Sequence, residues 1–165
     1  MTNSIGKLVD AICEAWTKCL PPPYGSGEYS ASEDGQTDCN RFVIEVCNKF
    51  GYTKLNGLKA NQMYDELVKN GDWILIPGDT AQFHSNSGVL VIAAWKNPDL
   101  NQSGHVCLVR PGIAQPSQSW GLTSPSCPMV ANVGQPGTCR IDRKASFAFG
   151  KDKIPHYFAL KSMMP

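Results

Sequence analysis

The chain has 165 residues, of which 42% are hydrophobic, and this length and composition suit one compact domain with a real core. Fifteen lysines and arginines nearly balance fourteen aspartates and glutamates, which argues against a protein that holds nucleic acid by neutralising phosphates. No apolar run approaches the roughly 18 residues of a membrane span. We therefore expect a single domain over residues 1–165, with no nucleic-acid partner and no membrane span.

The first predicted element is an amphipathic helix from about Ser4 to Cys19. Its apolar side chains recur at helical spacing, at Ile5, Leu8, Val9, Ile12, Cys13 and Trp16. Three prolines at 21–23 end the helix, and the Pro-, Gly- and Ser-rich segment 21–36 is typical of a loop. Because polar residues interrupt the apolar pattern, it does not match a Sec signal peptide. The protein then stays in the cytoplasm, is exported by a machine that ignores Sec signals, or is a mature form.

Two further helices and a group of strands follow. One helix begins near Asp38 or Cys39 and ends at Gly51, and another covers about 61–70. Strands are expected at 88–95, 105–109, 129–133 and 157–160, with a turn over 97–104 between the first two. Because helices come first and strands follow, the sequence predicts an α+β fold with N-terminal helices packed on an antiparallel β-sheet.

Seven cysteines are many for a chain of this length: Cys13, Cys19, Cys39, Cys47, Cys107, Cys127 and Cys139. The sequence has no CxxC pair and no HxxxH pattern, so we expect no metal site. One or more disulfides would suit an oxidising destination such as the periplasm, and buried thiols acting as small hydrophobic residues are the alternative. Because the number of cysteines is odd, at least one remains a thiol even if all the others pair, and Cys39 is the candidate for that thiol.

Cys39 is the candidate nucleophile because it stands where a polar loop gives way to a helix. Thr37 or Asp38 can cap that helix, which leaves Cys39 in its first turn. The positive end of the helix dipole favours a thiolate there. Phe42 and Val43 place Cys39 at the edge of the core-facing stripe, within reach of a base on the sheet. The alternative is a packing or disulfide cysteine.

His105 is the candidate base among three histidines. It opens a strongly predicted strand directly after Gly104, and a glycine there permits close approach of backbone or substrate. His84 lies in a polar segment, 82–87, which reads as a solvated loop, and His156 near the C-terminus reads as structural. The alternative for His105 is an ordinary core or edge histidine.

Asn132 is the candidate for the group that orients the imidazole. It is a lone amide in the apolar segment 129–133, and a buried amide needs a hydrogen-bond partner that a histidine would supply. The alternative is an ordinary turn asparagine before Gly134.

These residues resemble the NlpC/P60 superfamily of cell-wall peptidases. The segment Asp38-Cys39-Asn40-Arg41-Phe42-Val43 is similar to the superfamily's Asp-Cys-Ser-Gly-Phe-Val, and Gly104-His105-Val106 is similar to its Gly-His-Val motif. Asn40 and Arg41 depart from that pattern. The wider sequence, about 4–134, resembles the type VI secretion amidase effectors, in the branch of family 1.

The resemblance implies a papain-like fold and hydrolysis of a peptidoglycan stem peptide, with the γ-D-glutamyl–meso-diaminopimelate bond as the expected target. It implies catalysis by Cys39, His105 and Asn132 without metal or cofactor, in a monomer. It also implies a toxin made without a Sec signal, delivered to the periplasm of a target cell and countered by a periplasmic immunity protein. Two alternatives remain open: a phage-type lysin or cross-link-cleaving amidase on the same scaffold, and a non-catalytic module that binds cell wall or a partner.

Overall fold

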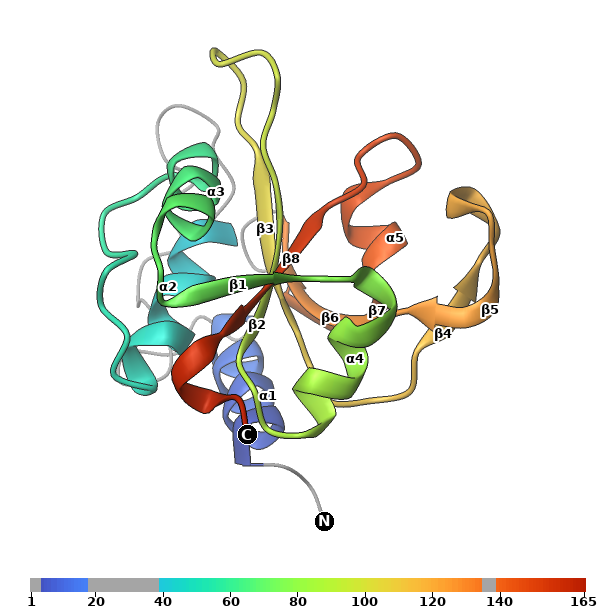
Figure 1. The fold of residues 1–165 in the computed structure, drawn as a ribbon, viewed down its shortest axis with the longest axis horizontal. Helices are drawn as coiled ribbons and strands as arrows, with labels where there is room; N and C mark the ends of the chain where they lie inside the picture. Colours follow the sequence, from blue (N-terminus) through green and yellow to red (C-terminus); the bar gives the residue numbers. More distant parts are fainter. Residues whose placement is uncertain (1–3, 18–38, 135–138) are drawn as a thin grey trace.

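A six-stranded antiparallel sheet forms the centre of the molecule in the computed structural model, which describes residues 4–17, 39–134 and 139–165 (Figure 1). Its strand order is β1-β8-β2-β3-β6-β7, and every neighbouring pair is antiparallel. The strands are β1 (Trp73–Ile76), β2 (Val91–Trp95), β3 (His105–Val109), β6 (Met129–Val133), β7 (Cys139–Lys144) and β8 (His156–Leu160). The connection from β3 to β6 carries a separate hairpin of β4 (Gln115–Ser117) and β5 (Leu122–Cys127), joined by a 3₁₀ turn, Gln118–Trp120.

Three N-terminal helices cover one face of this sheet: α1 (Ser4–Thr17), α2 (Cys39–Lys49) and α3 (Ala60–Lys69). In Figure 1, α2 and α3 lie to the left of the strands and α1 lies below them. The helix α2 packs mainly on β3, because Phe42, Val43 and Val46 turn a fully buried stripe toward it. Gly51, at a φ of 79°, adopts the left-handed conformation just after α2, where a glycine ends a helix without strain.

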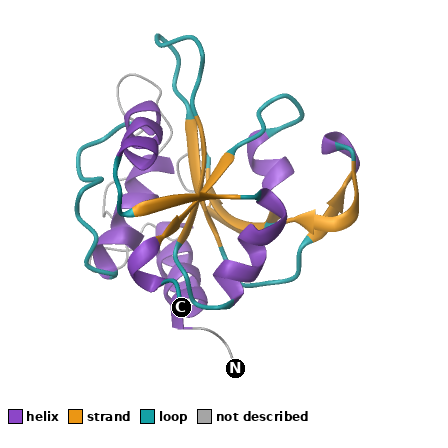
Figure 2. Cartoon of the chain, in the orientation of Figure 1, coloured by secondary structure: helices purple, strands orange, loops and turns teal. Residues whose placement is uncertain are grey.

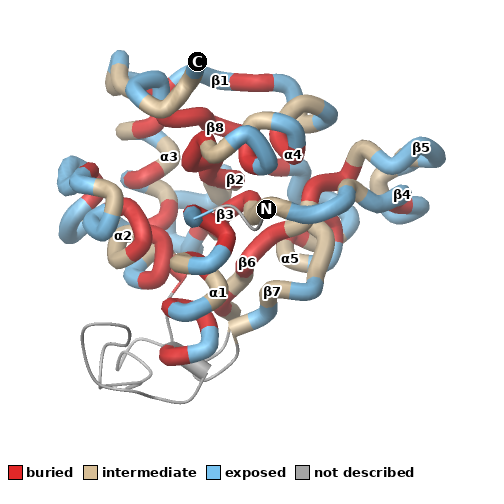
Figure 3. Tube along the Cα trace, turned by 90° about the horizontal axis from the view of Figure 1, so that it is seen from below, coloured by how far each residue is buried: buried red, intermediate tan, exposed pale blue. Residues whose placement is uncertain are grey.

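The opposite face carries the remaining helices, α4 (Gly78–Asn86) and α5 (Ala145–Phe149), together with the β4–β5 hairpin (Figure 2). A last 3₁₀ turn, Lys161–Met163, follows β8. Alternation along β3 divides the core between the two faces: Val106 and Leu108 pack toward the N-terminal helices, and Cys107 and Val109 pack toward α4 and α5. The central strands are buried on both sides, as Figure 3 shows.

The predicted α+β class with an antiparallel sheet is therefore confirmed. The three predicted N-terminal helices and the strands at 105–109, 129–133 and 157–160 occur at nearly the expected bounds, and the strand expected over 88–95 is confined to Val91–Trp95. The sequence prediction omitted β1, the β4–β5 hairpin, β7 and α5. The expected loop over 21–36, the residue Cys19 and the capping residues Thr37 and Asp38 lie outside the described residues.

The expected loop around His84 is a wrong prediction, because 82–87 lies largely in α4. This helix buries polar side chains rather than an apolar stripe. Ser85 donates its hydroxyl to the Val109 carbonyl at 3.0 Å, and the Gln82 amide donates to the Arg110 carbonyl at 2.8 Å. Such a helix leaves no hydrophobic period in the sequence.

A disulfide joins Cys13 in α1 to Cys139 in β7, with 5.4 Å between their Cα atoms. Four other described cysteines, Cys39, Cys47, Cys107 and Cys127, are buried thiols. Disulfide-bonded cysteines and buried thiols, the two kinds expected from the sequence, are thus both present, and Cys39 is one of the thiols.

Candidate cysteine–histidine–asparagine site

Cys39 is the first residue of α2, as the sequence predicted. Its side chain is only 1% exposed, and it belongs to the core cluster that α2 and β3 build together. The amino-terminal end of α2 therefore directs its positive dipole at the Cys39 sulfur, which stabilises negative charge there.

His105 opens β3 and pairs with Trp95 at the end of β2. Gly104, directly before it, is so closely packed that the position has no room for a side chain. A Cβ atom at Gly104 would lie 2.4 Å from Asn61 Oδ1 and 2.5 Å from the Trp95 carbonyl oxygen. The close approach expected at Gly104 is therefore an approach of protein groups, the Asn61 side chain and the Trp95 backbone.

Asn132 lies in β6, on the strand next to β3, and not in a turn before Gly134. Its Oδ1 atom lies 2.6 Å from His105 Nε2. An amide oxygen only accepts, so Nε2 carries the hydrogen and donates it to Asn132. In the neutral ring this leaves Nδ1 as the lone-pair nitrogen, which can act as a base.

Cys39 is the other hydrogen-bond partner of the His105 imidazole. Burial lowers the pKa of His105, but hydrogen bonding to Cys39, the charge on Cys39 and the hydrogen bond to Asn132 outweigh this effect. The resulting pKa is raised above the usual 6.5, although the Lys153 ammonium opposes the rise. The structure thus brings together the three residues singled out from the sequence, in the order Cys39–His105–Asn132.

Other buried thiols are poor alternatives to Cys39 as a nucleophile. Burial raises the pKa of Cys47 to about 12. Burial also raises the pKa of Cys107 well above 9.0, with a further contribution from the charge on Cys39. Both thiols therefore stay protonated at neutral pH, and a protonated thiol is a weak nucleophile.

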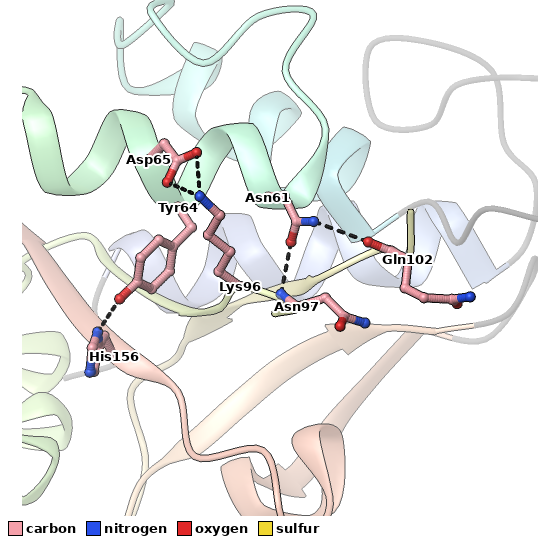
Figure 4. Close-up of polar contacts among 7 residues, drawn as sticks. All are labelled: Asn61, Tyr64, Asp65, Lys96, Asn97, Gln102 and His156. Carbon is pink, nitrogen blue, oxygen red and sulfur yellow. Dashed lines mark hydrogen bonds and ion pairs between the residues drawn. The ribbon is translucent and has the colours of Figure 1, made fainter. Parts of the chain in front are cut away.

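The remaining histidines lie on other elements. His84 is in the last turn of α4, and His156 opens β8 as an exposed residue. His156 Nδ1 hydrogen-bonds to the Tyr64 hydroxyl at 2.5 Å (Figure 4). That contact with a helix is in keeping with the structural role expected of His156.

Two residues that the sequence did not single out hold His105 in place. The Phe149 ring meets the imidazole edge to face, with 5.0 Å between ring centroids. Asn61, in the first turn of α3, donates to the Gln102 carbonyl at 3.0 Å and accepts from the Asn97 amide at 2.9 Å (Figure 4). It therefore ties together both arms of the loop that leads into His105. A helix-start asparagine gives no sequence signal of a contact 41 positions away.

No cluster of three or more His, Cys, Asp or Glu side chains that could hold a metal occurs among the described residues. Within the same part of the chain, no helix is long and apolar enough to cross a membrane. The sequence matches no model of a known protein family and no curated protein.

Proposed function

We propose that this protein is a papain-like cysteine amidase that hydrolyses peptidoglycan stem peptides, with Cys39 as nucleophile, His105 as base and Asn132 as its orienting group. The observation that carries the proposal is the hydrogen-bonded series Cys39–His105–Asn132, built from a helix start and two adjacent strands. A thiol, an imidazole and an amide in this order are the groups that acyl transfer through a thioester requires.

In the first half of the proposed reaction, His105 Nδ1 takes the proton of the Cys39 thiol. The thiolate attacks the amide carbonyl carbon, and the positive end of the α2 dipole stabilises the negative oxygen of the tetrahedral intermediate. The imidazolium then gives its proton to the leaving nitrogen, the C–N bond breaks, and a thioester to Cys39 remains. The raised pKa of His105 favours the imidazolium that this step consumes.

In the second half, a water molecule replaces the departed amine. His105 takes one of its protons, the hydroxide attacks the thioester carbonyl, and the C–S bond breaks to release the acid. The imidazolium returns its proton to Cys39. Throughout, Asn132 accepts from Nε2 and so keeps Nδ1 directed at the sulfur.

The substrate part of the proposal rests on the resemblance of the sequence motifs to the NlpC/P60 superfamily and the type VI amidase effectors. The proposed bond is γ-D-glutamyl–meso-diaminopimelate. Since stem peptides of the mature wall lie outside the inner membrane, the proposed enzyme acts in the periplasm of a target cell. A bacterium that produces this enzyme then needs a periplasmic inhibitor against the same enzyme delivered by neighbouring cells.

Digestion of purified peptidoglycan by the wild type, Cys39→Ala and Cys47→Ala tests this proposal. Cys47 is the matched control, because it is a buried thiol in the same helix with a pKa of about 12. We expect the wild type and Cys47→Ala to release fragments with a new diaminopimelate amino group, and Cys39→Ala to release none. Products cut at the diaminopimelate–D-alanine cross-link would identify the alternative amidase. A folded wild type that releases nothing would favour the binding module.

A further inference from the structure

A pocket of about 360 Å³ opens beside the candidate site, between α3, the end of β2 and the loop that follows it. It is at the small end of the roughly 300–1,000 Å³ range of ligand pockets. Its lining residues are Tyr64, Ala94, Trp95, Lys96, Asn97, Pro98, Leu100, Ile154 and His156.

The pocket adjoins the candidate base through Trp95. Trp95 lines the pocket, and its Cα atom is the register partner of His105 across the β2–β3 pair. Lys153 links the two places as well, since its ammonium lies 5.0 Å from the Trp95 ring centroid and its charge acts on His105. A ligand group in this pocket would therefore lie near a substrate whose scissile bond is held at Cys39.

The polar residues that line the pocket contact one another or residues next to the pocket, as Figure 4 shows for Tyr64, Lys96 and Asn97. Lys96 Nζ contacts both carboxylate oxygens of Asp65, at 2.6 and 2.8 Å, and Tyr64 pairs with His156. Lys96 is the one lysine or arginine among the described residues that line the pocket. The charge of Lys96 is thus balanced by Asp65, and the Lys153 ammonium adds a positive charge over the Trp95 wall.

The remaining walls are aromatic and aliphatic, with side chains of Trp95, Pro98, Leu100 and Ile154. Such walls suit the apolar face of a ring, and Tyr64 and His156 offer hydrogen bonds at its edge. A small, hydroxyl-rich ring meets both demands, because its C–H face packs on the apolar walls and its hydroxyls reach Tyr64 and His156.

We propose that this pocket is a saccharide subsite, which holds a glycan ring of the substrate while Cys39 attacks the peptide attached to it. This inference rests on the proposed function for its substrate, because the stem peptide of peptidoglycan is joined to a glycan ring. The enzyme would then prefer stem peptides that are still attached to the glycan.

The first test compares hydrolysis of a disaccharide-linked tetrapeptide with hydrolysis of the same tetrapeptide without sugar. Tyr64→Phe removes only the hydroxyl that contacts His156, and Leu100→Ala trims a side chain that is 75% exposed. Each should lower kcat/KM for the sugar-linked substrate about fivefold to tenfold, and leave that for the free peptide within about twofold. Ile113→Ala, at a residue 78% exposed that does not line this pocket, should change neither. Equal losses on both substrates would overturn the saccharide assignment.

The second test measures binding without chemistry. The probe is the glycan disaccharide carrying a single L-alanine amide, which is neutral and lacks the scissile bond, added to Cys39→Ala and followed by the NMR shift of the Trp95 indole N–H. A saturable shift that Tyr64→Phe weakens is expected. No shift overturns the subsite, even if stem peptides are hydrolysed. A shift at Trp95 with no hydrolysis by the wild type supports the subsite and refutes the proposed amidase.

Discussion

Gly104→Ala should destabilise the protein strongly, because the added methyl group has no room. Its Cβ would lie 2.4 Å from Asn61 Oδ1 and 2.5 Å from the Trp95 carbonyl oxygen, and the second atom belongs to the backbone of a paired strand. Forcing that strand apart costs about 1–3 kcal/mol, as overpacking does. Displacing Asn61 forfeits hydrogen bonds to Asn97 and Gln102, each worth about 1 kcal/mol. We therefore expect a loss of about 3–5 kcal/mol in the free energy of unfolding.

Urea denaturation followed by circular dichroism measures this loss, and Gly71→Ala is the matched control. A Cβ at Gly71 meets no atom within 4 Å, and its backbone is outside the left-handed region. Replacing such a glycine stabilises a protein by about 0.4–1 kcal/mol, through the unfolded chain. A loss below about 1 kcal/mol for Gly104→Ala would refute the steric reasoning.

A double mutant separates the two clashes. Asn61→Ala removes the side chain that the new methyl group would meet, while the Trp95 carbonyl stays in place. Asn61→Ala and Gly104→Ala together should therefore cost less than the sum of the single changes. Additivity to within about 0.5 kcal/mol would show that Asn61 moves aside freely.

The remaining predictions on the site concern its imidazole. His105→Ala should abolish hydrolysis of the free stem peptide, whereas His84→Ala, in α4, should change kcat less than about twofold; similar losses at both would overturn the assignment of the base. Asn132→Ala should lower kcat less than His105→Ala does, because an orienting group takes no part in the covalent step. Because the pKa of His105 is raised above 6.5, activity should fall as the pH rises through it, since the Cys39–His105 pair then loses the proton that the leaving nitrogen receives. Asn132→Ala removes one contact that raises this pKa, so the alkaline limb of the profile should move to lower pH; an unmoved limb would contradict the hydrogen bond.

Local chemistry made the candidate site predictable. Cys39 follows a polar segment and begins an apolar helical stripe, and His105 follows a glycine and begins an apolar strand. In both cases the neighbouring residues alone predict where the side chain lies in its helix or strand. Asn132 was harder to place, because a polar residue near a glycine fits a turn as well as a strand. Only the pairing of β3 with β6 decides between them, and that pairing joins segments more than twenty residues apart.

Two of the elements that sequence reasoning missed, β7 and α4, lack a hydrophobic period. The strand β7 reads Cys-Arg-Ile-Asp-Arg-Lys and lies at the sheet edge, where charged residues are tolerated. The helix α4 buries Gln82 and Ser85, whose side chains hydrogen-bond to neighbouring backbone carbonyls. Its core-facing positions are therefore polar in the sequence, where an apolar stripe is expected. Both elements are specified by tertiary contacts rather than by local propensity.

The disulfide between Cys13 and Cys139 connects the redox state of the compartment to the candidate site. Cys139 opens β7, and β7 is an edge strand held in the sheet through β6, the strand that carries Asn132. The two cysteines are 126 positions apart, and closing so long a loop restricts the unfolded chain, so reduction should lower the free energy of unfolding by about 2–5 kcal/mol. Denaturation with and without dithiothreitol measures this, and the double variant Cys13→Ser, Cys139→Ser is the control that should not respond to the reductant. If the wild type is equally stable when reduced, the disulfide does not secure β7. If instead reduction loosens β6 and β7, the proposed hydrolysis should weaken in parallel, and activity should be highest under oxidising conditions.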